Sequence, residues 1–180
     1  MTSIFETDRL LIRRLCPTDF PAFYELQGNP KTHRYTGSTV DDISSAKLSL
    51  ERFIYLYSKP NNDFWVWAVE RKSDGIMVGT VAIVKGYSGP TGEGPEIGYR
   101  FLEKYWGNGY AGEVCDPLID YAINAMKLPW IFGQADVKNI ASIKVLERSK
   151  LIFLKEYFNE KENCTDRVYR LDRDGLPISV

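Results

Sequence analysis

The sequence predicts a mixed α/β domain, and three observations support this fold class. Strand-like and helix-like segments alternate in the order β-α-α-β-β-β-α-β-α-β-β. The central β-α-β-α-β portion needs at least one crossover, which places parallel strands in the sheet. A hairpin signal, Asp74-Gly75, adds antiparallel strands. We therefore expect a twisted mixed sheet of six to seven strands with helices on both faces.

The first half of the chain has clear start and stop signals. Pro17 ends the first strand, and Thr18-Asp19 opens a helix that Gly28-Asn29-Pro30 breaks. Asp41 and Asp42 lie at the start of the second helix, where their negative charges interact favourably with the helix dipole. The expected elements are a strand (8–15), a helix from about 18, a helix (40–58) and two strands (63–71 and 76–84).

The second half is expected to contain a glycine- and proline-rich loop and six further elements. Pro117 falls inside one expected helix, where it removes a hydrogen bond and costs about 3 kcal/mol unless the helix kinks. The expected order is a loop (86–95), a strand (96–102), a helix (109–126), a strand (130–137), a helix (139–149) and a closing pair of strands (151–158 and 167–172).

Length and composition predict one soluble domain spanning residues 1–180. Apolar residues make up 44% and charged residues 26% of the chain, and the net charge is −1. The sequence has no basic stripe of the kind that would indicate nucleic-acid binding. No apolar run approaches the ~20 residues that a membrane span needs. We expect a cytoplasmic monomer or homodimer with neither nucleic acid nor membrane as a partner.

The numbers and positions of cysteine and histidine limit which metal sites, disulfides and catalytic triads the chain can form. Cys16, Cys115 and Cys164 are far apart, which suits a reduced chain without a disulfide framework or a zinc site. His33 is the only histidine, so a histidine-based triad or a multi-histidine metal site is nearly excluded. No metal is expected.

The stretch KYWGNGYAGE (104–113) lies between a strand and a helix. Unpaired N–H groups at a helix N-terminus favour anions, and glycine lets a ligand approach the backbone. A plain helix-start turn remains an alternative. The stretch lacks the Gly-Lys-Ser/Thr of a Walker A loop, and although residues 107–112 match GxGxxG, a dinucleotide-binding unit usually opens its fold.

Five segments in order resemble the GNAT N-acetyltransferase superfamily, in its RimJ/RimL-like branch. They are TDRLLIRRLCPTDFPAFYEL, GNPKTHRYTG, EIGYRFLEKYWGNGYAGE, DVKNIASIKVLE and the closing strand with Asp166 and Tyr169. The resemblance covers nearly all of the chain. It implies a GNAT fold with a splayed parallel strand pair, here 96–102 and 130–137, and acetyl-CoA as cosubstrate.

The resemblance also implies cosubstrate-binding positions. The main chain of Arg100, Phe101 and Leu102 would bind the pantetheine arm, with an ordinary strand end as the alternative. The pyrophosphate loop would comprise Lys104, Trp106, Gly107, Asn108, Gly109, Tyr110 and Ala111. Two positions depart from the pattern: Lys104 replaces Gln or Arg but remains a donor, and Gly112 stands where threonine is common.

The helix after the fifth family strand carries further candidates. Asn139 and Ser142 share a helix face, and Asn139 also suits a plain N-cap. Arg148 would reach the adenosine 3′-phosphate or simply favour the helix C-terminus. Lys150 stands where the family has glycine, so it must accept a left-handed backbone or the helix must end differently.

The resemblance implies direct acetyl transfer to a primary amine in a ternary complex. Glu96 is the candidate base, through water, with a substrate-orienting or surface carboxylate as the alternative. Ser142 is the candidate donor to the thiolate, with a capping or solvated serine as the alternative. The acceptor, a protein N-terminus or a small-molecule amine, would be shaped by residues 18–58 and by the loops 86–95 and 159–166. A catalytically weak or inactive acyl-CoA-binding or interaction protein is the competing hypothesis.

Overall fold

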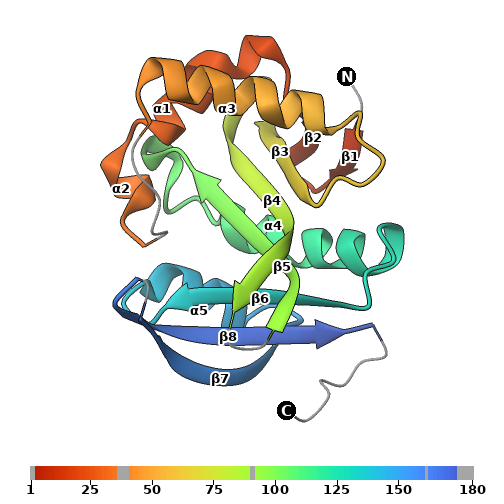
Figure 1. The fold of residues 1–180 in the computed structure, drawn as a ribbon. Helices are drawn as coiled ribbons and strands as arrows, with labels where there is room; N and C mark the ends of the chain where they lie inside the picture. The colour runs from red at the N-terminus through yellow and green to blue at the C-terminus, as the bar shows by residue number, and fades with distance from the viewer. Residues whose placement is uncertain (1–2, 36–40, 90–91, 161, 174–180) are drawn as a thin grey trace. The chain divides into compact units, whose positions relative to one another are not determined.

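The computed structural model describes residues 3–35, 41–89, 92–160 and 162–173 (Figure 1). Its strands pair in the order β1-β2-β3-β4-β5-β6-β8-β7, which confirms a mixed sheet but gives it eight strands instead of six to seven. The chain clusters into a first unit (1–82 and 99–111) and a second unit (83–98 and 112–180). Strands β4 and β5 run through both units.

The first unit contains the N-terminal hairpin, three helices and the hairpin that follows them. Its elements are β1 (Ser3–Glu6), β2 (Leu10–Arg14), the 3₁₀ turn η1 (Pro17–Asp19), α1 (Phe20–Gln27), α2 (Pro30–His33), α3 (Ile43–Leu56), β3 (Phe64–Arg71), the start of β4 (Ile76–Gly89), the end of β5 (Gly92–Phe101) and the 3₁₀ turn η2 (Glu103–Tyr105).

The second unit contains the remainder of β4 and β5 and the C-terminal elements. These are most of α4 (Tyr110–Asp120), the π-helical turn η3 (Tyr121–Ala125), β6 (Trp130–Asp136), α5 (Ile140–Glu147), β7 (Ile152–Asn159) and β8 (Cys164–Asp172).

Local capping explains where the helices of the first unit begin and end. The expected break at Gly28-Asn29-Pro30 is confirmed, because α1 ends at Gln27 and the Asn29 side chain caps α2 by accepting from the Lys31 N–H. The Asp42 side chain caps α3 by accepting from the Ser45 N–H at 2.7 Å. These caps satisfy N–H groups that have no partner inside the helix.

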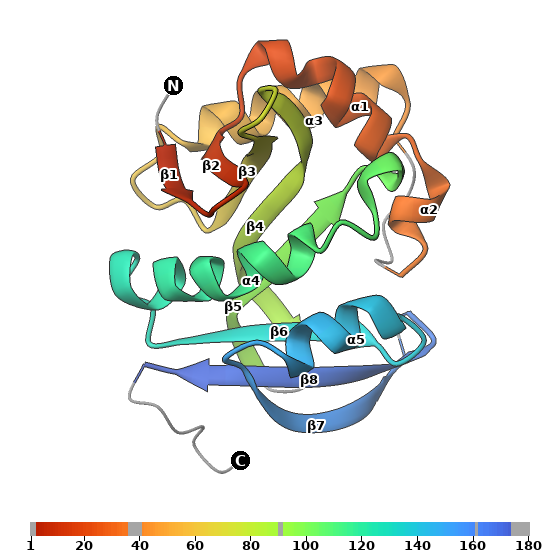
Figure 2. The same ribbon diagram turned by 180° about the vertical axis from the view of Figure 1, so that it is seen from behind.

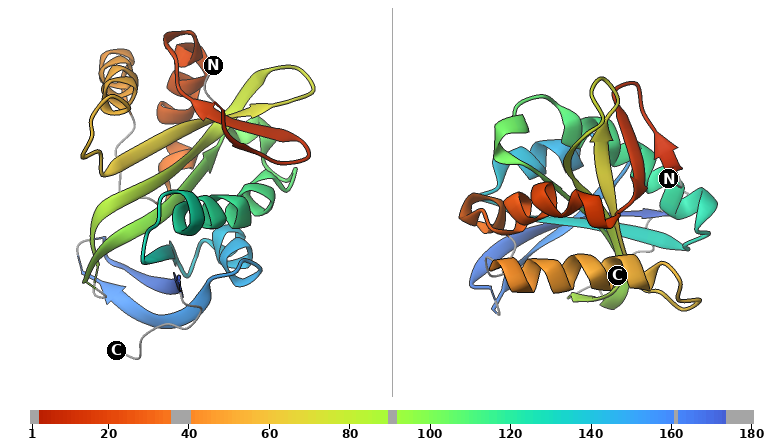
Figure 3. Two further views of the ribbon diagram at one scale, coloured as in Figure 1. Left: turned by 90° about the vertical axis from the view of Figure 1, so that its right-hand side faces the viewer. Right: turned by 90° about the horizontal axis from the view of Figure 1, so that it is seen from above.

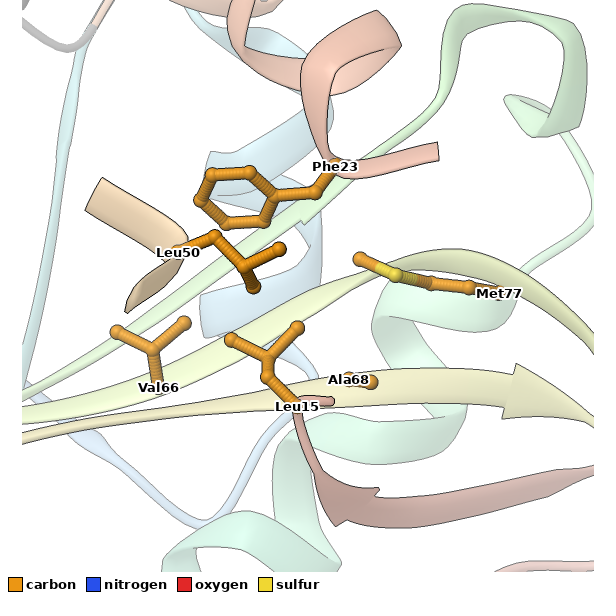
Figure 4. Close-up of a cluster of buried hydrophobic side chains, with 6 residues drawn as sticks. All are labelled: Leu15, Phe23, Leu50, Val66, Ala68 and Met77. Atoms are coloured by element: carbon orange, nitrogen blue, oxygen red, sulfur yellow. The ribbon is translucent and has the colours of Figure 1, made fainter. Parts of the chain in front are cut away.

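A buried cluster holds α1 and α3 on the strands of the first unit (Figure 4). It consists of Leu15, Phe23, Leu50, Val66, Ala68 and Met77. Burying a side chain of the size of leucine or phenylalanine contributes roughly 1.5–3 kcal/mol. The two helices therefore cover one face of β3 and the start of β4, and they lie alongside each other (Figure 3).

Gly79 lets β4 approach β5 closely in the first unit. A Cβ atom at this position would overlap the carbonyl oxygen of Arg100 and lie 2.8 Å from Cδ1 of Phe101. Next to it, the Leu102 N–H donates to the Val78 carbonyl at 3.0 Å. The absence of a side chain at Gly79 thus permits the strand pairing at the end of β5.

Parallel and antiparallel pairing meet in the second unit. Strand β5 pairs in parallel with β6, with Glu96 opposite Phe132, whereas β6 pairs with β8 antiparallel over its full length. Helix α5 packs on β6 where Gly133 leaves room for Leu146 (Figure 2). The crossover expected from the sequence is therefore present.

The structure also bears on the sequence-based expectations for residues 86–95 and for Pro117. The loop expected over 86–95 was wrong, because β4 extends to Gly89 and β5 begins at Gly92, while residues 90–91 lie outside the described residues. Backbone pairing between two long strands overrides the turn-like composition of this stretch. Pro117 does lie within α4, and the π-helical turn η3 starts four residues later.

No helix in the described part of the chain is long and apolar enough to cross a membrane. Within the same residues, His, Cys, Asp and Glu side chains form no group of three or more that could hold a metal ion.

Candidate functional site

The end of β5 presents two different edges. The Leu102 N–H donates to Val78 on β4, so its amide is used within the sheet. Because successive residues of a strand point their main-chain groups to opposite edges, the amide of Phe101 faces away from β4. The Phe101 carbonyl accepts a hydrogen bond from the indole N–H of Trp106 at 2.7 Å. Of the expected main-chain positions, Phe101 is thus better placed than Leu102 to meet a ligand.

The side chain of Arg100 lies on the helical side of β5 in the first unit. Its Nη1 donates to Oε1 of Gln27, at the end of α1, at 3.2 Å. Burial lowers the pKa of Arg100, and the negative charge of Asp41 opposes that shift. The guanidinium is therefore part of a polar cluster at the end of α1.

Ion pairs tie the turn η2 to the first two helices. Lys104 contacts Glu25 of α1 at 2.8 Å, with both side chains about half exposed. Glu103 accepts from Nδ2 of Asn29 at 3.0 Å and also pairs with Lys31. Lys104, expected as a donor to the pyrophosphate, is therefore engaged with a carboxylate of α1.

The glycine loop has the backbone conformation that its sequence suggests. Gly107 and Gly109 have φ values of +78° and +77°, in the left-handed region that favours glycine. The Asn108 side chain closes the turn by donating to the Tyr105 carbonyl at 2.9 Å. Helix α4 begins directly afterwards at Tyr110. A Cβ atom at Gly107 would meet no atom within 4 Å, so this loop leaves space for a ligand.

Two arginines that the sequence did not single out flank this loop. Arg9 donates through Nη2 to the Asn108 carbonyl at 3.0 Å, and its guanidinium lies 4.9 Å from the centre of the Tyr110 ring. The guanidinium of Arg71 lies 4.9 Å from the centre of the ring of Tyr105, two residues before Gly107. Arg9 lies in the β1–β2 turn and Arg71 at the end of β3. Both are remote in sequence from the loop, so only the folded chain reveals them.

Glu96 lies in the second unit, on the face of β5 opposite to the one that packs under α5. Ile97 is buried beside Gly133 on the α5 side, and side chains alternate along a strand. Glu96 therefore shares the face of its neighbour Phe132 and of Arg170, which lies across from Phe132 on β8.

The environment of Glu96 favours its protonated form. Burial raises the pKa of Glu96 to about 8, and the negative charges of Asp166 and Glu162 add to the shift. Asp166 is itself buried and accepts from Nδ2 of Asn159 at 3.0 Å. A carboxyl group with a pKa near neutrality is a suitable general base or acid.

The start of α5 holds the two remaining polar candidates together. Asn139 is the N-cap, and its Oδ1 accepts from the Ser142 N–H at 3.2 Å. The capping function expected as an alternative for Asn139 is therefore present. Ser142 is partly buried in the first turn of α5.

The structure shows how helix α5 ends although Lys150 stands where the family pattern has glycine. Arg148, an exposed residue, is the C-cap with φ −94°, and Lys150 is not among the described residues with positive φ. The Lys150 N–H instead donates to Asp116 at 2.8 Å, and its Nζ donates to Oδ1 of Asp120 at 2.6 Å. Lys150 therefore joins the end of α5 to α4 without a left-handed backbone.

Known proteins identify the family. The family model described as acetyltransferase (GNAT) domain matches residues 9–151. The uncharacterized N-acetyltransferase YoaA of Bacillus subtilis (strain 168) is 29% identical over 160 residues, covering 87% of this chain and 85% of YoaA.

Solved structures share the fold at low identity. A GNAT-family acetyltransferase from Bacillus anthracis superposes with a TM-score of 0.77 at 20% identity, covering 94% of this chain and 98% of that one. RimL, described as a ribosomal L7/L12 alpha-N-protein acetyltransferase in complex with coenzyme A, gives 0.78 at 14% identity, covering 95% and 98%. These structures show a shared fold, and the family match, which covers most of the sequence, shows that the chain belongs to the GNAT acetyltransferase family.

Proposed function

We propose that this protein is an acetyl-CoA-dependent N-acetyltransferase of the RimJ/RimL-like branch, with a primary amine as acceptor. The observation that carries the proposal is the loop before α4, in which Gly107 and Gly109 both have left-handed backbones and helix α4 begins at the next residue, Tyr110. Burial also raises the pKa of Glu96 on β5, which suits a carboxyl group that acts as a base near neutral pH. The family match from residue 9 to 151 includes segments of both units, which supports one domain over residues 1–180.

The loop residues fit the cosubstrate. Gly107 and Gly109 have left-handed backbones next to the N-terminus of α4, and the Cβ side of Gly107 is open. Such a loop directs backbone N–H groups at a phosphate. We assign the pyrophosphate of acetyl-CoA to residues Trp106–Ala111, with support from the coenzyme A complex of RimL. The main chain of Arg100, Phe101 and Leu102 and the side chains of Lys104, Asn139 and Arg148 remain proposed contacts.

Acetyl-CoA supplies a thioester whose carbonyl carbon the amine attacks, and two side chains of this protein move the protons. Glu96 accepts a proton from the ammonium, directly or through water, so that the nitrogen gains a lone pair. Ser142 donates a hydrogen bond to the sulfur as the carbon–sulfur bond breaks, and the second proton that the nitrogen loses goes to the sulfur, which leaves as the thiol. The products are an amide, the CoA thiol and one released proton.

The pKa of Glu96 also favours one class of amine. An α-amino group has a pKa of about 7.7–8.0 and a lysine-type amine about 10.4. A carboxyl group with a raised pKa takes a proton more readily from the less basic α-ammonium group than from a lysine-type ammonium group. We therefore propose α-amines, such as protein N-termini or amino acids, as better acceptors than simple alkylamines.

The test measures release of the CoA thiol between pH 6 and 9.5 with an α-amine acceptor. We expect the rate to rise as Glu96 loses its proton near pH 8, and Glu96→Gln to lower kcat by about 10²–10⁴-fold. Ser142→Ala is expected to lower kcat by about tenfold with a smaller change in KM.

Glu156→Gln provides the matched control, because Glu156 is an exposed carboxylate on β7 that pairs with Arg167. If Glu96→Gln and Ser142→Ala react as fast as the wild type, both assigned roles are wrong. Tight binding of acetyl-CoA without thiol release from any amine would instead favour the non-catalytic alternative.

A further inference from the structure

The Asn108–Gly109 peptide lies at the centre of the proposed pyrophosphate loop, and its orientation decides what that loop offers a phosphate. Glycines with positive φ stand on either side of Asn108. Glycine rotates at little steric cost, so the peptide can turn either its N–H or its carbonyl toward the ligand. A carbonyl oxygen in that position would repel a phosphate.

Arg9 holds this peptide in one orientation. Its Nη2 donates to the Asn108 carbonyl at 3.0 Å, and a Cβ atom at Gly109 would lie 3.7 Å from the same Nη2. No peptide bond among the described residues is cis. In a planar trans peptide the carbonyl and the N–H point in opposite directions. The Gly109 N–H is therefore directed away from Arg9.

The position of Arg9 is itself fixed by the fold of the first unit. The Arg9 carbonyl accepts from the Lys72 N–H at 2.9 Å, so the β1–β2 turn and the β3–β4 turn lie side by side (Figure 3). The guanidinium lies over the buried ring of Tyr110, the first residue of α4. A cation near an aromatic face adds about 0.5–1 kcal/mol at an exposed site.

We propose that Arg9 is a positioning residue for the cosubstrate, which keeps the Gly109 N–H turned toward the pyrophosphate by holding the Asn108 carbonyl. The charged donor also polarises the peptide and so strengthens the N–H as a donor. The inference rests on the proposed use of acetyl-CoA, and it assigns Arg9 a role behind the loop without direct contact to phosphate.

The experiment compares dissociation constants of the full chain for CoA, 3′-dephospho-CoA and pantetheine by calorimetry. Arg9→Met removes the donor and keeps an unbranched apolar side chain. We expect it to weaken CoA and 3′-dephospho-CoA equally, by about tenfold, and to leave pantetheine unchanged. Arg9→Lys restores a charged donor and is expected to recover most of the affinity. Lys72→Met, which removes a neighbouring cation that pairs with Glu6, is expected to bind all three ligands like the wild type.

A second measurement keeps the idea testable if Arg9→Met also lowers stability. In the wild type, CoA should shift the Gly109 amide proton downfield, and in Arg9→Met this shift should be lost while the dispersion of the spectrum is kept.

Equal weakening of all three ligands would overturn the inference, since it indicates a general structural role. Unchanged binding would also overturn it. A loss confined to CoA would place Arg9 at the 3′-phosphate instead. If the wild type binds no CoA, the proposed function and this inference both fail. If it binds CoA but acetylates no amine, only the transfer reaction fails, and the binding comparison still decides the role of Arg9.

Discussion

At the scale of single residues, Glu96 links the proposed chemistry to stability. Burial and the charges of Asp166 and Glu162 raise its pKa from 4.5 to about 8. A group whose pKa is raised on folding binds its proton more tightly in the folded state. Its contribution to stability is complete below pH 4.5 and is lost as the pH rises through 8. A loss of stability of this kind is typical of a base whose pKa is raised at a functional site.

Replacing Glu96 by glutamine should therefore change the pH dependence of unfolding. Between pH 4.5 and 8 the wild type should lose up to about 1.4 kcal/mol per pH unit relative to Glu96→Gln. Urea unfolding of both proteins from pH 4.5 to 9 measures the difference, with Glu156→Gln as the control for removing a carboxylate. Parallel curves for wild type and Glu96→Gln would show that Glu96 titrates normally.

At the scale of secondary-structure elements, the contact between β4 and β5 depends on Gly79. A Cβ atom there would overlap the Arg100 carbonyl, which is backbone and cannot swing aside as a flexible side chain can. We expect Gly79→Ala to lower the free energy of unfolding by about 1–3 kcal/mol. It should also raise KM for acetyl-CoA, because it displaces the strand end at Arg100–Phe101.

Gly112→Ala is the matched comparison, since a Cβ atom at Gly112 would meet no atom within 4 Å. Alanine is a better helix former than glycine, so this change in α4 should add up to about 1 kcal/mol. Urea unfolding of the two variants checks both expectations. Equal stability of Gly79→Ala and the wild type would mean that β4 and β5 can separate without cost.

Local signals decided which elements could be predicted. Asp74-Gly75 forms the expected turn, with Gly75 at φ +70°, and Gly28-Asn29-Pro30 separates α1 from α2. The prediction of a loop over residues 86–95 was wrong. Glycine and proline are typical of loops, but here pairing between two long strands determines the backbone conformation. Strand β1 was missed because its four residues are too short for an alternating pattern.

At the scale of the whole molecule, the candidate site was predictable only where it is local in sequence. The glycine loop is one continuous motif, and its left-handed glycines agree with that interpretation. The partners of the site are remote: Arg9 contacts Asn108 across 99 residues, and Asp166 influences Glu96 from another strand. Sequence spacing carries no information about such pairs, so only the fold reveals them.

The central claim is that this chain moves an acetyl group from CoA to a primary amine. The direct measurement is release of the CoA thiol from acetyl-CoA across a panel of α-amines, polyamines and N-terminal peptides, with the acetylated product identified by mass. We predict thiol release with at least one α-amine, matched by an equal amount of acetylated product and strongly reduced in Glu96→Gln. Acetyl-CoA that binds but is left intact by every amine would contradict the claim.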